Sequence, residues 1–308
     1  MSYTIKDFKG VIPALLTVFD EDENIDEAGL RQLVSHLIEK GVDGLYVAGS
    51  TGEGFTMTSE ERMRVVDIVM DETAGRVPVV VHVGAIGTKI TIELAEHAKS
   101  AGAVGISSVP PFYYHFSEEQ IVRYYRDIAE AVDLPMIVYN VPLAGLLGMN
   151  AIRALAKLDG VAGIKYTAAS QYEITQIKKE MGEEFLVYSG ADEMAMNGLI
   201  SGADGIIGSF YNMIPEAFIG IYEAVQAKDM DLAAQRQSTA LDIIMIALSY
   251  PSFYAVMKKV LSWQGVAAGV CRRPFTNLTK EEETELKDVY KKLKEDRNIT
   301  GIDFLDLL

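Results

Sequence analysis

The amino-acid sequence predicts an α/β protein, a (β/α)8 TIM barrel with a C-terminal helical extension. Eight short runs of apolar and β-branched residues recur between Val11 and Gly208. Longer segments, with apolar residues every three or four positions, lie between these runs. Such regular alternation indicates parallel strands joined by right-handed helical crossovers, and eight units of this kind close a barrel. A length of 308 residues suits one barrel with an appendage.

The predicted strands and helices alternate in order along the chain. The strands are Val11–Thr17, Gly44–Ala48, Val77–Val83, Gly105–Val109, Met136–Asn140, Ala162–Tyr166, Phe185–Ser189 and Gly205–Gly208. The helices between them include Asp26–Lys40, Ser59–Glu72, Ile90–Lys99, Glu118–Ala131 and Tyr172–Met181. Gly41, Gly102 and Gly202 each stand just before a strand, where a left-handed residue is expected to end the preceding helix.

Helical periodicity continues after the eighth strand, further than one closing helix requires. The predicted helices there are Glu216–Ala227, Met230–Leu248, Phe253–Trp263 and Glu281–Glu295. No linker rich in proline, glycine and serine separates them from the barrel. We therefore place the barrel at residues 1–228 and a packed helical extension at residues 229–308, within a single structural domain.

Composition excludes several classes of partner and site. A formal net charge of −16 opposes binding to a nucleic-acid backbone, which requires clustered lysine and arginine. Lys258 and Lys259, and the charged stretch 291–294, are expected to be solvated helix faces. The single cysteine, Cys271, excludes an intramolecular disulfide and a thiolate metal cluster.

The N-terminal residues Met1–Thr4 do not begin a charged region that an apolar region follows. No window reaches about 18 uninterrupted apolar residues, the length that a membrane span requires. We therefore expect a soluble cytoplasmic protein with no membrane partner.

The candidate active site is expected at the carboxyl ends of the strands, where barrel enzymes place their chemistry. Lys165 stands within the apolar sixth strand, where burial disfavours the ammonium and frees the amine as a nucleophile toward ketones. A lysine ion-paired at the barrel rim is the alternative. Tyr139, at the end of the fifth strand, could relay protons beside Lys165, although a tyrosine there could also serve only packing.

Three further strand exits carry polar or small residues. Ser50 and Thr51 lie among glycines after the second strand, in a segment suited to holding a carboxylate or forming an ordinary turn. Asp192 and Glu193 follow the seventh strand, where they could cap a helix or accept hydrogen bonds from a polyhydroxylated ligand. Ser209, directly after Gly208, adds a hydroxyl at the eighth exit.

No cofactor motif accompanies these residues. The four histidines, His36, His82, His97 and His115, have no spacing that gathers them into a metal site. Neither a phosphate-binding loop nor a dinucleotide fingerprint occurs. The sequence therefore favours a mechanism without a metal or a nucleotide cofactor.

Three motifs, in order on the predicted strand ends, carry a family resemblance: Gly49–Glu53, Tyr139–Pro142 and Gly163–Lys165. They resemble the dihydrodipicolinate synthase / N-acetylneuraminate lyase family, and the resemblance extends from about Gly10 to about Pro274. It implies a class I aldolase that needs no cofactor beyond a covalent imine between Lys165 and pyruvate.

The resemblance also implies roles for individual residues. Tyr139 would move protons, Ser50 and Thr51 would bind the pyruvate carboxylate, and the Thr51 hydroxyl would join the proton relay. Tyr113, in the segment Pro111–Tyr114, would reach the active site of a neighbouring subunit, and a homotetramer would follow.

Residues near the substrate tail distinguish the branches of this family. Dihydrodipicolinate synthases usually carry an arginine where this chain has Ala144. The sialic acid lyase branch is the better match, and its motifs imply a set of residues around the substrate's carboxamide and glycerol chain. These residues are Thr167, Gly190, Asp192, Glu193, Gly208 and Ser209.

Two departures from that branch keep other functions open. Ala191 stands where an aromatic residue is frequent, and Phe210 stands where threonine is common. The leading hypothesis is reversible cleavage of N-acetylneuraminate to N-acetylmannosamine and pyruvate. The alternatives are another pyruvate-dependent aldolase or dehydratase that acts on a different sugar acid, and a non-catalytic barrel that senses sialic acid or pyruvate.

Overall fold

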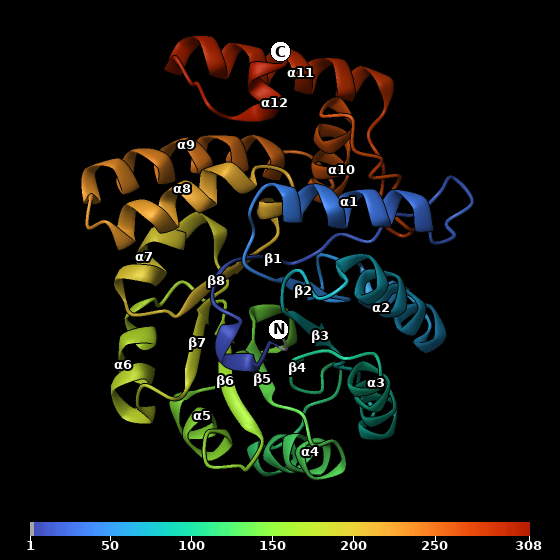
Figure 1. Ribbon diagram of the computed structural model, residues 1–308, viewed down its shortest axis with the longest axis vertical. Helices are drawn as coiled ribbons and strands as arrows, with labels where there is room; N and C mark the ends of the chain where they lie inside the picture. Colours follow the sequence, from blue (N-terminus) through green and yellow to red (C-terminus); the bar gives the residue numbers. More distant parts are fainter. Residues whose placement is uncertain (1–2) are drawn as a thin grey trace.

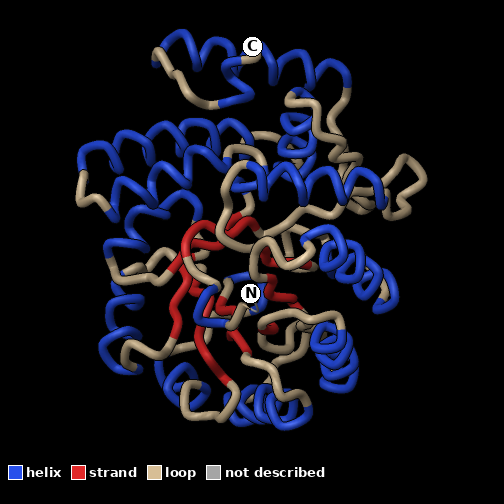
Figure 2. Tube along the Cα trace, in the orientation of Figure 1, coloured by secondary structure: helices blue, strands red, loops and turns tan. Residues whose placement is uncertain are grey.

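The computed structural model describes residues 3–308, which form a ring of eight parallel strands inside a layer of helices (Figures 1 and 2). From β2 to β8 each strand pairs with the next one along the chain, and β8 pairs with β1. The strands are β1 (Gly10–Pro13), β2 (Leu45–Val47), β3 (Val79–His82), β4 (Gly105–Ser108), β5 (Met136–Asn140), β6 (Val161–Tyr166), β7 (Leu186–Ser189) and β8 (Gly205–Gly208). All eight predicted strands are present, most of them shorter than predicted.

The barrel closes between β1 and β2. Ala14 and Tyr46 form an isolated parallel bridge, and the Leu15 N–H donates to the Tyr46 carbonyl at 2.8 Å. This contact joins the two ends of the eight-stranded sheet. The predicted (β/α)8 barrel is confirmed.

Helices cover the outside of the barrel, one after each strand (Figure 1). Threonine and serine caps start several of them, as at Thr58, which accepts the Glu61 N–H in a reciprocal capping box. Gly41, Gly102 and Gly202 have φ values of 88°, 91° and 100°, as predicted for residues that end helices. The helices are α1 (Glu27–Glu39), α2 (Ser59–Thr73), α3 (Thr88–Ser100), α4 (Glu118–Ala131), α5 (Met149–Leu155), α6 (Tyr172–Met181), α7 (Ala195–Ile200) and α8 (Pro215–Gln226).

The inside of the barrel is a packed core. Tyr46, Tyr139, Tyr188 and Ile207 belong to one buried cluster there, which Phe8 completes at the amino end of the strands. The Tyr188 hydroxyl donates to the Phe8 carbonyl at 2.7 Å, so the polar end of this ring is satisfied. Because these rings fill the interior, the site is sought at the carboxyl end of the strands, where barrel enzymes place their chemistry.

Four further helices follow the barrel. They are α9 (Met230–Leu248), α10 (Phe253–Trp263), α11 (Lys280–Arg297) and α12 (Asp303–Asp306). The first two have the bounds that the sequence predicted, and α11 is slightly longer. Together they lie along one side of the molecule, with α9 beside α8 (Figure 1). The division at residue 228 stays a prediction.

Within residues 3–308, no single helix is long and apolar enough to cross a membrane. The helices α9 and α10 satisfy the length and composition criteria only as a pair, and they are bent by 116° relative to one another. The expectation of a soluble cytoplasmic protein depends partly on Met1 and Ser2, which lie outside the described residues.

Candidate active site

Lys165 lies inside the barrel, near the carboxyl end of β6. Its strand neighbours Ile164 and Tyr166 pack outward against the helices, so alternation turns the Lys165 side chain inward. The side chain is only 3% exposed, and its Nζ lies 4.2 Å from the centre of the Tyr139 ring and 4.6 Å from that of Tyr46. Burial lowers the pKa of Lys165 to about 7, although the Asp192 carboxylate partly opposes this effect.

The alternative of a rim ion pair is wrong for Lys165. Among residues 3–308, no carboxylate lies within 4.0 Å of its ammonium nitrogen. The amine is therefore buried without a carboxylate beside it, and loss of hydration favours its neutral form over the charged one.

Tyr139 is the register partner of Lys165 on β5, so the two side chains share the inner face of the sheet. Burial raises the pKa of the Tyr139 phenol, and the nearby hydroxyls of Thr167 and Ser50 partly offset that increase. The phenol is therefore protonated at neutral pH.

A tight turn presents Ser50 and Thr51. The Glu53 N–H donates to the Ser50 carbonyl at 3.0 Å, and the Gly54 N–H donates to the Gly49 carbonyl at 3.0 Å. A side chain at position 54 would collide with the Ala48 carbonyl, since a Cβ there would lie 2.2 Å from its oxygen. The Thr51 hydroxyl is 2.7 Å from that of Ser209, which links the second strand exit to the eighth.

Asp192 is buried in the segment that follows β7. Its Oδ2 accepts, at 2.8 Å, the N–H of Phe210, which is the first residue of the short 3-10 helix Phe210–Asn212 after β8. Asp192 therefore serves a helix N-terminus, although that helix follows β8 and not β7; its predicted role toward a polyhydroxylated ligand stays a prediction. Burial raises the pKa of Asp192 to about 7, while the Phe210 N–H acts in the opposite direction. Its position requires glycine at 208, where a Cβ would lie 2.1 Å from the Asp192 Oδ1.

Gly190 keeps the space above Lys165 open. A Cβ at this position would lie 1.9 Å from the Thr167 hydroxyl oxygen and 3.0 Å from the Lys165 Cε. A side chain there would displace both groups. The predicted Gly190 therefore has a steric reason for its place in the site.

Two cavities lie among the residues that follow the carboxyl ends of the strands. The larger and more open one, of about 490 Å³, brings together the predicted tail residues Thr167, Gly190, Asp192, Glu193 and Ser209. Its outer wall is apolar. That wall includes Met194, Phe210, Leu248 and Phe253.

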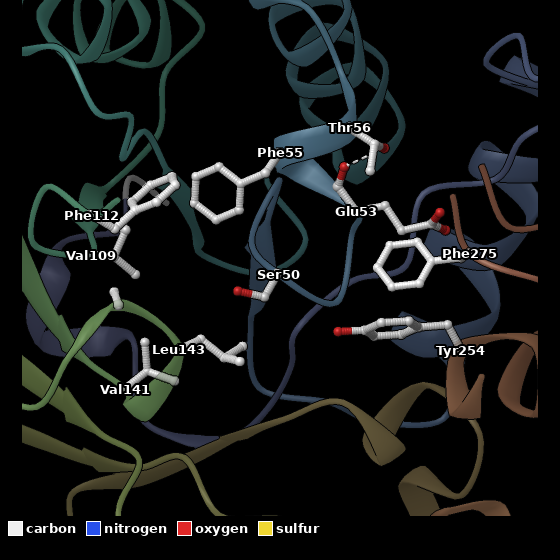
Figure 3. Close-up of a pocket in the computed structure, with 11 residues that line it drawn as sticks. Ser50, Glu53, Phe55, Thr56, Val109, Phe112, Val141, Leu143, Tyr254 and Phe275 are labelled. Carbon is white, nitrogen blue, oxygen red and sulfur yellow. Dashed lines mark hydrogen bonds between the residues drawn. The ribbon is translucent and has the colours of Figure 1, made fainter. Parts of the chain in front are cut away.

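The smaller cavity, of about 190 Å³, lies on the Ser50 side and is mostly apolar (Figure 3). Figure 3 shows Ser50 between the Phe55 and Phe112 rings on one side and Tyr254 and Phe275 on the other. The remaining lining residues are Glu53, Thr56, Val109, Val141, Leu143 and Ala144.

Tyr113 lines neither cavity. It is 83% exposed on the loop after β4, with a left-handed φ of 76°, and its ring packs edge-on against Tyr114 at 5.0 Å. Within one chain, the structure does not bring Tyr113 together with Lys165 and Tyr139. Its predicted action across a subunit boundary stays a prediction.

His82 and Tyr46 are parts of the site that sequence reasoning did not assign to it. The His82 ring is buried 6.0 Å from that of Tyr139, and burial, together with Arg62 and Lys165, holds the pKa of His82 well below its usual range. Alternation along β2 and β3 was the signal that could have placed both rings inside the barrel. Among residues 3–308, no three His, Cys, Asp or Glu side chains are arranged to hold a metal ion.

The prediction that Lys258 lies on a solvated helix face is wrong. Together with Lys259 it was expected on a solvated helix face, but its side chain is only 2% exposed and pairs with Glu53 at 2.6 Å. Lys259, the next residue of α10, does lie near the surface and pairs with Glu283 at 2.7 Å. A sequence window cannot reveal the difference, because the partner of Lys258 is 205 residues away.

Comparisons with known proteins agree on the family. The model of the Dihydrodipicolinate synthetase family matches residues 7–293. The N-acetylneuraminate lyase of Shigella boydii serotype 4 is 39% identical over 94% of this chain and 98% of its own length.

Solved structures give the same result. CdNal of Clostridium difficile, in complex with mannosamine, superposes with a TM-score of 0.90 at 36% identity, over 93% of this chain and 99% of that one. A catalytic-lysine mutant of the sialic acid aldolase of Ruminococcus gnavus has a TM-score of 0.91 at 32% identity, over 97% and 99% of the two chains.

Proposed function

Because this chain belongs to the dihydrodipicolinate synthetase family, we propose that it is a class I aldolase that reversibly cleaves N-acetylneuraminate to N-acetylmannosamine and pyruvate. The observation that carries the proposal is the buried amine of Lys165, which has no carboxylate within 4.0 Å among the described residues and a pKa lowered to about 7. An amine that is neutral near pH 7 is a nucleophile toward a ketone. Relatives that are named for sialic acid cleavage support the substrate.

The reaction begins with the open-chain keto acid. The Lys165 amine attacks the keto carbon, and the resulting carbinolamine loses water to give a protonated imine. Burial keeps the Tyr139 phenol protonated, and this phenol donates its proton to the departing hydroxyl group. The products of this step are the imine, water and the Tyr139 phenolate.

Carbon–carbon cleavage follows, because the imine nitrogen can accept electrons. The bond between the carbon next to the imine and the hydroxyl-bearing carbon breaks, and its electrons form an enamine. The Tyr139 phenolate takes the proton of that hydroxyl, which becomes the aldehyde of N-acetylmannosamine. Return of this proton to the enamine carbon, and hydrolysis of the imine, release pyruvate and the free amine.

The two cavities supply the binding groups. Ser50 and Thr51 hold the pyruvate carboxylate, and the Thr51 hydroxyl takes part in the proton relay. The more open cavity holds the sugar tail through hydrogen bonds to the Thr167, Asp192, Glu193 and Ser209 side chains. Gly190 and Gly208 leave the space that this arrangement requires.

No cofactor is part of this proposal, because the only covalent group is the imine between Lys165 and pyruvate. The enzyme works as a cytoplasmic homotetramer in which Tyr113 enters the site of a neighbouring subunit. The 83% exposure of the Tyr113 ring in the single chain supports this arrangement.

A second candidate is a related aldolase for a different 2-keto-3-deoxy sugar acid. The Phe210 ring favours it, because Phe210 lies against Phe253 at 5.7 Å and adds an apolar wall where a hydroxyl would bind a glycerol chain. Rapid turnover of a 2-keto-3-deoxy sugar acid, without pyruvate release from N-acetylneuraminate, would show that the second candidate is correct and the first is not.

The mechanism is tested by trapping the imine with borohydride in the presence of pyruvate. We expect a pyruvate adduct on Lys165, no adduct and no pyruvate release in the Lys165→Ala variant, and an unchanged adduct in the matched control Lys157→Ala, which alters an exposed lysine. A wild-type protein without an adduct on Lys165, identified by peptide mass, contradicts the Schiff-base mechanism.

A further inference from the structure

A buried ion pair joins the hydroxyl-bearing turn to the C-terminal helices. The Nζ of Lys258, on α10, lies 2.6 Å from the Oε1 of Glu53, and the two side chains are 2% and 0% exposed. Such a pair cannot be attributed to chance surface pairing, because both charges have given up their hydration. Its geometry must therefore be maintained by further partners.

Both charges have these partners. The second carboxylate oxygen of Glu53 accepts the backbone N–H of Arg272 at 2.8 Å, and the Lys258 ammonium also donates to the Val270 carbonyl at 2.5 Å. The Glu53 carboxylate is thus held between α10 and the segment that follows it. None of these contacts comes from the barrel strands.

The backbone of Glu53 in turn belongs to the turn that carries Ser50 and Thr51. Glu53 has a left-handed φ of 55°, which is unfavourable for a residue with a side chain. Its N–H closes the turn on the Ser50 carbonyl at 3.0 Å. Figure 3 shows its carboxylate directed away from Ser50, toward the Phe275 side of the cavity.

We propose that Glu53 and Lys258 are positioning residues, through which the C-terminal helices hold the Ser50 and Thr51 hydroxyls in place for a substrate carboxylate. The inference rests on the proposed function, in which these hydroxyls bind pyruvate. If Lys258 loses its charge, the Glu53 carboxylate is left buried without its cation, and hydration of that carboxylate requires the turn to move. The hydroxyls then move with it.

A purely structural role makes a different prediction. It would lower the stability of the protein and leave the kinetics of each folded molecule unchanged. A positioning role raises the pyruvate concentration needed for imine formation, while the limiting rate at saturating pyruvate stays close to that of the wild type, since Lys165 and Tyr139 are untouched. A higher half-saturating pyruvate concentration with an unchanged limiting rate therefore distinguishes the positioning role from the purely structural one.

The test measures borohydride trapping of Lys165 over a range of pyruvate concentrations. In Lys258→Met, which keeps most of the side-chain length, we expect the half-saturating concentration to rise roughly 10- to 100-fold, the effect of a displacement of about 1 Å. Lys258→Arg, which keeps the charge, should recover part of the affinity. Lys259→Met is the matched control, because its pair with Glu283 lies near the surface of the same helix, and it should match the wild type.

The outcomes are distinguishable. Failure to trap the wild-type protein overturns the proposed function. Normal trapping of the wild type, with unchanged half-saturation in folded Lys258→Met or an equal change in Lys259→Met, overturns the positioning role alone. If Lys258→Met does not fold, Glu53→Asp replaces it, because this variant keeps the charges and shortens the link by one methylene group; unchanged half-saturation there also overturns the proposal.

Discussion

At the scale of single residues, the site depends on groups whose pKa values are shifted from their ordinary values by burial. Lys165 and Asp192 are each buried, and each has a pKa shifted to about 7, the lysine downward and the aspartate upward. Because the Asp192 carboxylate is the charge that favours the Lys165 ammonium, the neutral amine is obtained where burial outweighs this attraction.

This balance predicts the pH dependence of imine formation. The neutral amine is the reactive form, so the second-order rate constant for trapping with pyruvate should fall as the pH decreases through about 7. In Asp192→Asn the carboxylate that raises the pKa of Lys165 is absent, and the falling limb should move to lower pH. A limb that stays in place, or moves to higher pH, in this variant contradicts the assignment to Lys165.

Sequence reasoning succeeded for residues whose neighbours decide their environment. The apolar run around Lys165 predicted its burial, and that burial is confirmed. It could not decide between two roles for Asp192, because the answer depends on the Phe210 N–H, which comes from a different strand exit. Tyr46 and His82 were missed as well, although strand alternation contains the information that turns them inward.

At the scale of elements, periodicity predicted every strand and most of the long helices. The structure adds α5, α7 and α12, which have seven, six and four residues and are too short to give a clear helical period. The largest error concerned α10, whose Lys258 and Lys259 look alike in the sequence. Only the packing of α10 against the turn after β2 makes one of them a buried cation.

The same difference predicts stability. Lys258→Met leaves a carboxylate buried without its cation, and we expect it to lower the free energy of unfolding by about 3–5 kcal/mol. Lys259→Met removes a partly exposed pair, for which the loss should stay below about 1 kcal/mol. Urea unfolding of the two variants compares these values directly, and equal losses would contradict the burial of Lys258.

At the scale of the whole molecule, one chain supplies nearly all of the predicted site. Lys165 and Tyr139 are register partners, Thr51 is hydrogen-bonded to Ser209, and Gly190 lies against both Thr167 and Lys165. Tyr113 is the exception, since its side chain is 83% exposed, whereas Lys165 and Tyr139 are buried. If Tyr113 acts in catalysis, the site is therefore completed only when subunits assemble.

Mixing two inactive variants tests the proposed assembly. If Tyr113 acts across a subunit boundary, Tyr113→Ala and Lys165→Ala subunits should each be inactive alone and regain activity after unfolding and refolding together. In such a hybrid, one site combines an intact Lys165 with an intact Tyr113 from its neighbour. Hybrid oligomers, verified by native mass spectrometry, that stay inactive would show that Tyr113 does not act in this way.

The pairing of Glu53 with Lys258 and Arg272 also orders the events of synthesis. The turn that carries Ser50 and Thr51 is translated early, but the residues that hold its carboxylate leave the ribosome only after the whole barrel has done so. A nascent chain that has closed its barrel would therefore still lack a finished carboxylate-binding turn. Catalytic competence would be acquired late, and a chain terminated before α10 would never acquire it.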